Sequence, residues 1–141
     1  MLRLVTPRLA YRGQDDLHRA DIELALAEKE FLWLDLEGPG QQEVLLLREV
    51  FRFHPLAIED CLHGLQRPKL DDYVDYLFLV LHAVSERSPE GRFNVAQIDA
   101  FIAPTYLVTV HAEPFSFVEE TFQQCGQKRE LLGKGTGFLL Y

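Results

Sequence analysis

The sequence predicts a single α/β domain in which helices lie on the faces of a mixed β-sheet. In the first half of the chain, segments with apolar residues at helical spacing alternate with short strand-like segments. In the second half, three strand-like segments follow one another. The chain has 141 residues, of which 48% are hydrophobic, so one domain can bury a substantial core. This combination is typical of a sheet covered by helices.

The first half is predicted to contain three strands and two helices. Short runs of aliphatic and aromatic residues predict strands at residues 2–5, 9–11 and 31–36. Apolar residues three or four positions apart predict helices over residues 14–29 and 41–53. A Glu-Gly-Pro-Gly sequence after the third strand favours a turn before the second helix. The predicted order is strand, strand, helix, strand, helix.

Three further strands are predicted in the second half. Residues 76–84 are apolar with one exception, which predicts a strand covered on both faces. Residues 85–92 are polar and predict a turn. Residues 93–102 and 106–110 are rich in β-branched and aromatic side chains, which favour strands. The three segments are therefore expected to pair as neighbouring strands of the sheet.

The end of the chain is predicted to form one helix and to begin another. Apolar residues at helical spacing predict a helix over residues 114–132, and Gly126 is expected to bend or interrupt it. The apolar side of this helix consists of Phe115, Val118, Phe122 and Cys125. Residues 133–141 run from a Gly-rich stretch into an apolar one. We interpret residues 1–132 as one domain and residues 133–141 as the start of a following, truncated helix.

Charge and motif content exclude several classes of function. The 22 acidic residues outnumber the 14 basic ones, giving a net charge of −8. Because the basic residues are scattered, nucleic acid is not expected as a partner, whereas cations are favoured. Residues 77–81 are the longest apolar run and fall far short of the about 20 residues that span a bilayer. The sequence contains no GxSxG motif and no Gly-rich phosphate loop, so no enzyme is predicted.

The cysteines indicate a reducing, cytosolic environment. Cys61 and Cys125 lie far apart in the sequence and form no CxxC pair, and no signal peptide precedes them. The histidines show neither HxxxH spacing nor a nearby Cys pair, so a zinc site is not predicted. Each histidine is interpreted as a packed or surface residue.

The segment that follows His54 carries the candidate site. A proline at position 55 favours a short helix over residues 55–63. On a wheel of about 100° per residue, Glu59, Asp60 and His63 share one side. The opposite side is hydrophobic and consists of Ile58, Cys61, Leu62 and Leu65. The acidic pair is therefore predicted to face outward together.

Two interpretations of this acidic pair are open at this stage. Adjacent carboxylates repel one another, and a hard divalent cation such as Mg²⁺ would relieve the repulsion by binding their oxygens together with water. A solvated helix face explains the same residues and is the commoner case. A second acidic group, Asp71, Asp72 and Asp75, is interpreted as a polar segment ahead of the next strand, with Arg67 and Lys69 balancing its charge.

Four segments together resemble one known protein family. They are FLWLDLEGP (residues 31–39), HPLAIEDCL (54–62), QRPKLDDYVDYLFLVLHAV (66–84) and QIDAFIAPTYLVTVH (97–111). These segments closely resemble the cytoplasmic N-terminal domain of the CorA family of divalent cation transporters. The combination of HPLxxED with QRPK and an apolar strand is far more specific than any one of its parts.

The resemblance implies a three-layer α/β/α domain on the cytoplasmic side of the cell membrane, in a homopentamer that continues into a stalk helix and two membrane helices. In that family the carboxylates of HPLxxED lie between subunits and bind regulatory divalent cations, Mg²⁺ or Co²⁺, together with acids of a neighbouring stalk helix. The matching positions are Asp60, the first expected metal ligand, and Glu59, the second. The pore signature Gly-Met-Asn is missing, because the only methionine is Met1.

Two alternatives remain open from the sequence. A zinc-transporting branch of the same superfamily shares the domain layout, so the transported ion is undecided between magnesium, cobalt and zinc. A free-standing soluble α/β protein that binds a small ligand would also account for a chain without membrane segments. The HPLAIED and QRPK segments favour the magnesium type.

Overall fold

A computed structural model describes residues 1–7, 10–13, 19–63, 66–87 and 93–127 of the chain. Within them, one mixed seven-stranded sheet has the order β2-β1-β3-β7-β6-β5-β4. The strands β3 and β7 run parallel in the middle of the sheet, and all other neighbours are antiparallel. The strand bounds are Leu2–Val5 for β1, Ala10–Gly13 for β2, Leu32–Glu37 for β3, Lys69–Asp72 for β4, Leu77–Arg87 for β5, Phe93–Ala103 for β6 and Tyr106–His111 for β7.

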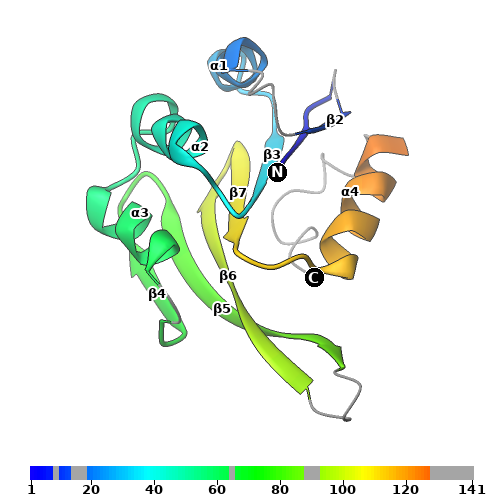
Figure 1. Cartoon of the computed structure of the whole chain (residues 1–141). Helices are drawn as coiled ribbons and strands as arrows, with labels where there is room; N and C mark the ends of the chain where they lie inside the picture. Colours follow the sequence, from blue (N-terminus) through cyan, green and yellow to red (C-terminus); the bar gives the residue numbers. More distant parts are fainter. Residues whose placement is uncertain (8–9, 14–18, 64–65, 88–92, 128–141) are drawn as a thin grey trace.

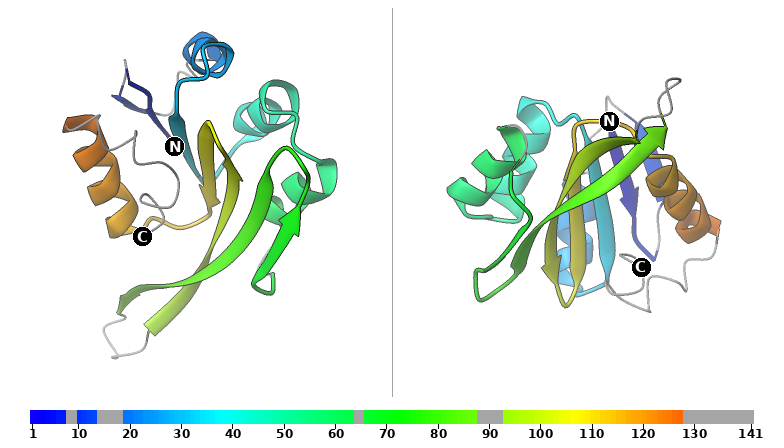
Figure 2. Two further views of the ribbon diagram at one scale, coloured as in Figure 1. Left: turned by 180° about the vertical axis from the view of Figure 1, so that it is seen from behind. Right: turned by 90° about the horizontal axis from the view of Figure 1, so that it is seen from below.

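Helices cover both faces of this sheet and make three layers (Figure 1). One face is covered by α1 (Arg19–Ala27), α2 (Gln41–Leu45) with the π-helical turn Leu46–Val50 that continues it, and α3 (Pro55–Leu62). The other face is covered by α4 (Ser116–Gln127), and Figure 2 shows the same separation from behind and from below. The predicted α/β/α sandwich with a mixed sheet is confirmed.

Alternating side chains of the central strands form two separate cores. In β3, Leu34 and Leu36 belong to the core under α1–α3, whereas Trp33 belongs to the core under α4. This alternation follows from the two-residue period of a strand. In the first core, the ring of Phe53 stacks on that of Phe101 with 3.8 Å between centroids. The segment between α2 and α3 is thereby fixed to the middle of the sheet.

Most predicted elements are present, and several boundaries differ. The predicted helix 41–53 ends earlier, because its second half is the π-helical turn and Phe53 is extended towards the core. The helix α4 continues through Gly126 to Gln127, so the expected interruption is wrong. Residues 128–132, the last of that predicted helix, and residues 133–141, the predicted start of another, lie outside the described residues.

The strand prediction needs two corrections. Residues 69–72, read from the sequence as a polar segment, form the edge strand β4 beside β5. The strand β5 buries Phe78 and Val80 on one face; on the other face Leu79 packs against the second core but Leu81 is 37% exposed, so that face is covered only in part. The strand also extends through Arg87 into the predicted turn. None of the described helices is long and apolar enough to cross a membrane.

Candidate functional site

The helix α3 is held at its N-terminus by His54. The Nδ1 atom of His54 accepts a hydrogen bond from the backbone N–H of Leu56 at 3.1 Å, and Pro55 occupies the first turn, where its missing N–H costs nothing. The backbone N–H of His54 donates to the hydroxyl of Tyr76 at 2.7 Å. Tyr76 directly precedes β5, so α3 is tied to the sheet at a fixed point.

The helix α3 packs one face against the core, and this packing decides which of its acidic side chains point to solvent. Ala57 and Ile58 are buried at 0% and 3% exposure, whereas the side chain of Glu59 is 60% exposed. His63 Nε2 lies 3.8 Å from Glu59 Oε1, and both side chains are open to solvent. Leu62, which the helical wheel placed on the hydrophobic side, is 44% exposed, so that part of the wheel is wrong. The outward placement of Glu59 and His63 is observed.

Asp60 lies at the boundary between α3 and the edge strand β4. Its side chain is 27% exposed, and its Oδ2 atom accepts a hydrogen bond from Lys69 Nζ at 2.6 Å. The same ammonium group is 3.3 Å from Asp71 Oδ2. The hydrogen bond to Asp60 is the main cause that raises the pKa of Lys69, so Lys69 is a firmly charged partner. Asp60 is therefore half-buried and paired, unlike Glu59.

A buried carboxyl group, which the sequence analysis missed, lies beneath Asp60. Asp99 on β6 is 2% exposed, accepts a hydrogen bond from Gln97 Nε2 at 2.7 Å and accepts another from the thiol of Cys61. Burial raises the pKa of Asp99 to about 6, and the charge of Asp60 acts in the same direction. The available signal was a carboxyl at an inward-facing position of an apolar strand, between Ile98 and Ala100.

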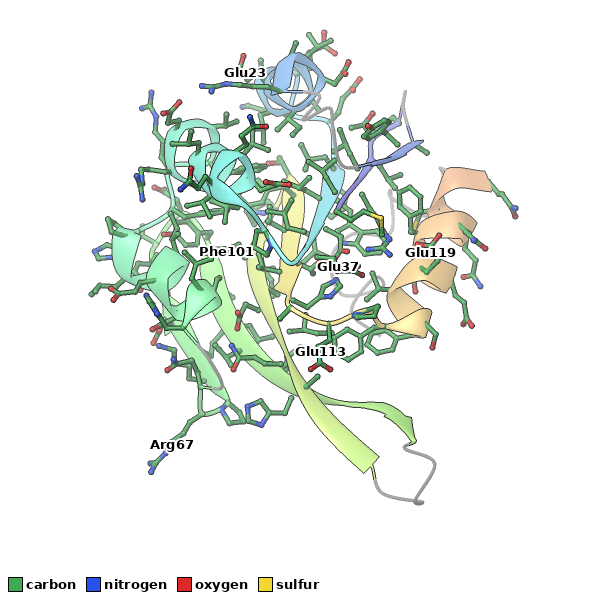
Figure 3. All side chains as sticks on the ribbon, viewed as in Figure 1. Glu23, Glu37, Arg67, Phe101, Glu113 and Glu119 are labelled. Atoms are coloured by element: carbon green, nitrogen blue, oxygen red, sulfur yellow. The ribbon has the colours of Figure 1, made fainter. Side chains whose placement is uncertain are left out.

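A second polar cluster, also missed from the sequence, lies on the α4 side of the sheet. Asp35 is fully buried and is contacted by Arg3 Nη1 at 3.0 Å, by the hydroxyl of Thr109 at 2.6 Å and by His111 Nε2 at 2.9 Å. Arg3 Nε also donates to Glu119 on α4 at 2.7 Å. Figure 3 labels Glu119 on α4 and Glu37 at the end of β3. Both oxygens of Asp35 are occupied, so this cluster joins elements rather than binding a ligand.

The described residues leave the acidic face of α3 incomplete as a metal site. Among them, no three His, Cys, Asp or Glu side chains converge so as to hold a metal ion. Glu59 and Asp60 would supply two carboxylates, and Mg²⁺ prefers six oxygens. The remaining ligands would have to be water or another chain. Glu59 and Asp60 thus lie near the end of one helix, and by themselves they do not complete the coordination of a metal ion.

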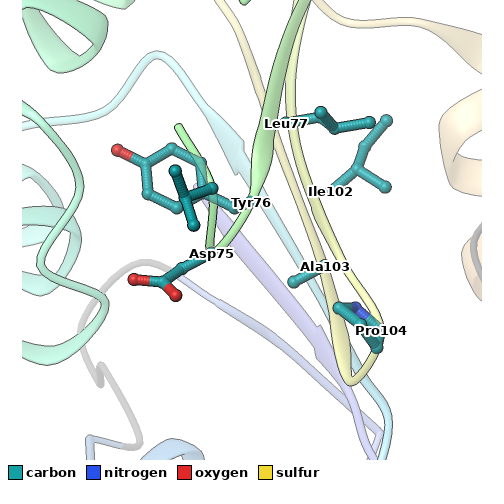
Figure 4. Close-up of a pocket in the computed structure, with 7 residues that line it drawn as sticks. Asp75, Tyr76, Leu77, Ile102, Ala103 and Pro104 are labelled. Carbon is teal, nitrogen blue, oxygen red and sulfur yellow. The ribbon is translucent and has the colours of Figure 1, made fainter. Parts of the chain in front are cut away.

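A shallow depression lies elsewhere, at the end of the β5–β6 pair (Figure 4). Its volume is about 350 Å³ and its lining contains one carboxylate, that of Asp75. Apolar residues make up most of the remaining lining: Val74, Tyr76, Leu77, Ile102, Ala103 and Pro104. The depression shares no residue with the acidic face of α3 and brings no set of polar groups together. It is not the candidate site.

Two solved structures share this fold. The soluble domain of CorA from Methanocaldococcus jannaschii matches 100% of this chain and 53% of its own chain, with a TM-score of 0.71 and 17% identity. The full-length CmaX protein matches 89% of this chain and 39% of its own, with a TM-score of 0.63 and 18% identity. At these identities the likeness shows the fold alone.

Sequence relatives carry the family assignment. A protein of Bacillus subtilis (strain 168) named "Putative metal ion transporter YfjQ" is 38% identical over 109 residues, which is 77% of this chain and 33% of that protein. The "Cobalt/magnesium transport protein CorA" of Thermotoga maritima is 38% identical over 50 residues, 35% of this chain and 14% of that protein. The chain thus spans a third or less of these relatives. Residues 28–140 match the family described as "CorA-like Mg2+ transporter protein", and the chain belongs to that family.

Proposed function

We propose that this chain is the cytoplasmic N-terminal domain of a CorA-type transporter of Mg²⁺ and Co²⁺ and that it senses divalent cations. The family match and the names of the relatives, which include magnesium and cobalt/magnesium transport proteins, support the ion class. The observation that carries the sensing role is that Glu59 and Asp60 lie side by side in the last turns of α3 and that water reaches both carboxylates. This acidic face is available to a second subunit.

Cation binding between subunits would control the assembly through simple electrostatics. In the proposed homopentamer, Asp60 and Glu59 of one subunit face acidic side chains of the next. A bound Mg²⁺ or Co²⁺ screens the carboxylates and favours the closed arrangement, and its loss allows their repulsion to loosen the interface. The transported ion would thus inhibit its own uptake. The incomplete coordination shell on α3 suits an ion that completes its ligands with water and with a neighbouring chain.

Asp60 is the central ligand of this proposal and Glu59 the supporting one. The charge of Asp60 acts on the buried acid Asp99, and Asp60 and Asp71 share the ammonium of Lys69, so two further carboxyl groups lie around Asp60 against one positive charge. Glu59 is more exposed and has His63 as its near neighbour. An ion at Asp60 would therefore gain more from charge neutralisation than an ion at Glu59 alone.

The length of the gene product is the first test. The proposal expects the reading frame to continue beyond Tyr141 into a stalk helix and two apolar segments of about 20 residues each. A frame that ends at Tyr141 would contradict the transporter role.

The second test measures cation-dependent closure in the assembled transporter. With Asp60→Ala, the Mg²⁺ concentration that half-inhibits uptake should rise at least fivefold, because the site loses a charged ligand. Glu120→Ala removes one exposed carboxylate from α4, on the other side of the sheet, and should leave this concentration unchanged. Equal inhibition of wild type and Asp60→Ala would contradict the proposal. Uptake of Zn²⁺ in place of Mg²⁺ would contradict the proposed ion class and assign the chain to the zinc-transporting branch.

A further inference from the structure

The ammonium group of Lys69 contacts one of the two carboxylate oxygens of Asp60, the residue proposed above as the central metal ligand. Its Nζ atom lies 2.6 Å from Asp60 Oδ2 and 3.3 Å from Asp71 Oδ2, between two carboxylates of different elements. We propose that Lys69 is a tethered competitor that lowers the affinity of the Asp60 site for Mg²⁺ and so sets the concentration at which the sensor responds. This inference rests on the proposed function and concerns the regulation of the same site.

Strand pairing and two neighbouring side chains hold the ammonium group of Lys69 next to Asp60. Lys69 is the first residue of β4 and pairs with Val80 of β5, and Asp71 pairs with Phe78. The two-residue period of a strand places the side chains of Lys69 and Asp71 on the same face of β4. The Nζ atom also lies 5.7 Å from the centroid of the Phe78 ring. A lysine that only protected a sheet edge would extend into water, whereas this one is directed to α3.

Charge balance explains why an ammonium group belongs there in the absence of metal. Asp60, Asp71 and the buried Asp99 bring three carboxyl groups to one side of the sheet. The positive charge of Lys69 lowers the pKa of Asp99 while Asp60 raises it, so the groups influence one another across α3, β4 and β6. One positive charge relieves part of this repulsion. A divalent ion at the same point would relieve more of it.

The bond to Lys69 is also weak enough to be exchanged. The side chain of Lys69 is 36% exposed and that of Asp60 is 27% exposed, so water screens the pair. Ion pairs that water still reaches contribute modestly to folding stability. The long side chain of Lys69 can move its charge into solvent when a cation arrives. Binding of Mg²⁺ at Asp60 would therefore replace the ammonium without disturbing the fold.

Arg67 provides a matched control for this role. It is two residues before Lys69, it is exposed, and Figure 3 shows its side chain extending away from the body of the molecule. Lys69→Gln and Arg67→Gln remove the same charge from the same segment. Only the first removes a charge that touches Asp60. A difference between the two variants therefore measures contact competition rather than net charge.

The experiment is a Mn²⁺ titration of the 141-residue chain, followed through the electron spin resonance of the free ion, for wild type and three variants. Lys69→Gln should bind Mn²⁺ roughly tenfold more tightly than wild type, because a tenfold change in affinity is about 1.4 kcal/mol and a unit charge about 4 Å from a divalent ion repels it by that order even in water. Arg67→Gln should bind like wild type. Asp60→Asn combined with Lys69→Gln should lose the gain. Thermal unfolding of each variant confirms that it is folded.

Two results would overturn the inference. Equal Mn²⁺ affinity of Lys69→Gln and wild type would show that the ammonium does not compete. A gain that persists after Asp60→Asn would place the ion elsewhere. The proposed function fails on a different result, unchanged cation inhibition of the Asp60→Ala transporter, so the two failures are distinguishable.

Discussion

The Nε2 atom of His111 lies 2.9 Å from each carboxylate oxygen of Asp35, and both residues are buried. Asp35 is on β3 and His111 ends β7, the parallel pair at the centre of the sheet. Arg3 completes the contact from β1 and extends it to α4 through Glu119. Three strands and the helix on the far side of the sheet from the candidate site are joined by this one cluster. The stability of the domain should therefore depend on the protonation state of His111.

The stability of the domain should fall as the pH rises above neutrality. Burial opposes a charge on His111, but the hydrogen bond and the charge of Asp35 outweigh it and raise the pKa of His111 above 6.5. The contribution of the charged pair is complete below pH 6.5 and is lost as the pH rises through the higher pKa of the folded state. Urea unfolding at pH 6 and pH 9 should give a larger unfolding free energy at pH 6. In His111→Gln this difference should shrink, and an equal pH dependence in both proteins would refute the assignment.

Removal of Asp35 should be the most damaging single change in this cluster. Asp35→Ala leaves the buried side chain of His111 without its counter-charge and leaves Arg3 with only the partly exposed carboxylates of Glu37 and Glu119, which costs about 3–5 kcal/mol of unfolding free energy. Glu37→Ala removes a carboxylate that is 3.5 Å from Arg3 and 20% exposed, and should cost about 1 kcal/mol or less. Chemical denaturation of the two variants compares the buried and the peripheral partner. Similar losses would contradict a central role for Asp35.

Asp99→Asn should stabilise the domain at pH 8 and have little effect at pH 4. Because burial raises the pKa of Asp99 from 3.8 to about 6, the favourable protonated state is present at low pH and is lost as the pH rises through about 6. At pH 8 the wild type carries a buried charge, and the neutral amide should gain up to about 3 kcal/mol. Thermal melts at both pH values test this. If Asp99→Asn were less stable than wild type at pH 8, the hydrogen bonds that Gln97 and Cys61 donate to the carboxylate would outweigh the cost of burying its negative charge.

His54→Ala should destabilise the domain by about 1 kcal/mol, because the backbone N–H of Leu56 loses its acceptor at the start of α3. His54→Asn, which restores a capping side chain, should recover most of this loss. His63→Ala changes an exposed histidine of the same helix end and should alter the unfolding free energy by less than about 0.5 kcal/mol. If His54→Ala and His63→Ala melted at the same temperature, the cap would have no measurable role.

The periodic parts of the fold could be predicted from the sequence because their burial follows a local pattern. Phe115, Val118, Phe122 and Cys125 share one side at helical spacing, and all four are buried in the core under α4. The edge strand β4 could not be predicted, since Lys-Leu-Asp-Asp is polar and becomes a strand through its pairing with β5. The π-helical turn after α2 likewise has no signal in the spacing of apolar residues.

The partners of the polar side chains could not be predicted from the sequence. The helical wheel placed Glu59 in solvent, as the structure does, but it could not show that Lys69 reaches Asp60 from a neighbouring strand. Asp35 stands out as an acid within an apolar strand, yet its partners Arg3 and His111 are 32 and 76 residues away. Partners at such separations are set by the strand order, which local spacing does not contain.

The location of a bound Co²⁺ ion in crystals of the assembled transporter tests the central proposal most directly, because anomalous scattering identifies the metal without reference to activity. The sensing role predicts a cobalt peak that contacts a carboxylate oxygen of Asp60 directly or through one water, with further ligands from a second subunit. The ammonium of Lys69 should then have left Asp60. Peaks confined to other parts of the protein, with Lys69 still bound to Asp60, would contradict it.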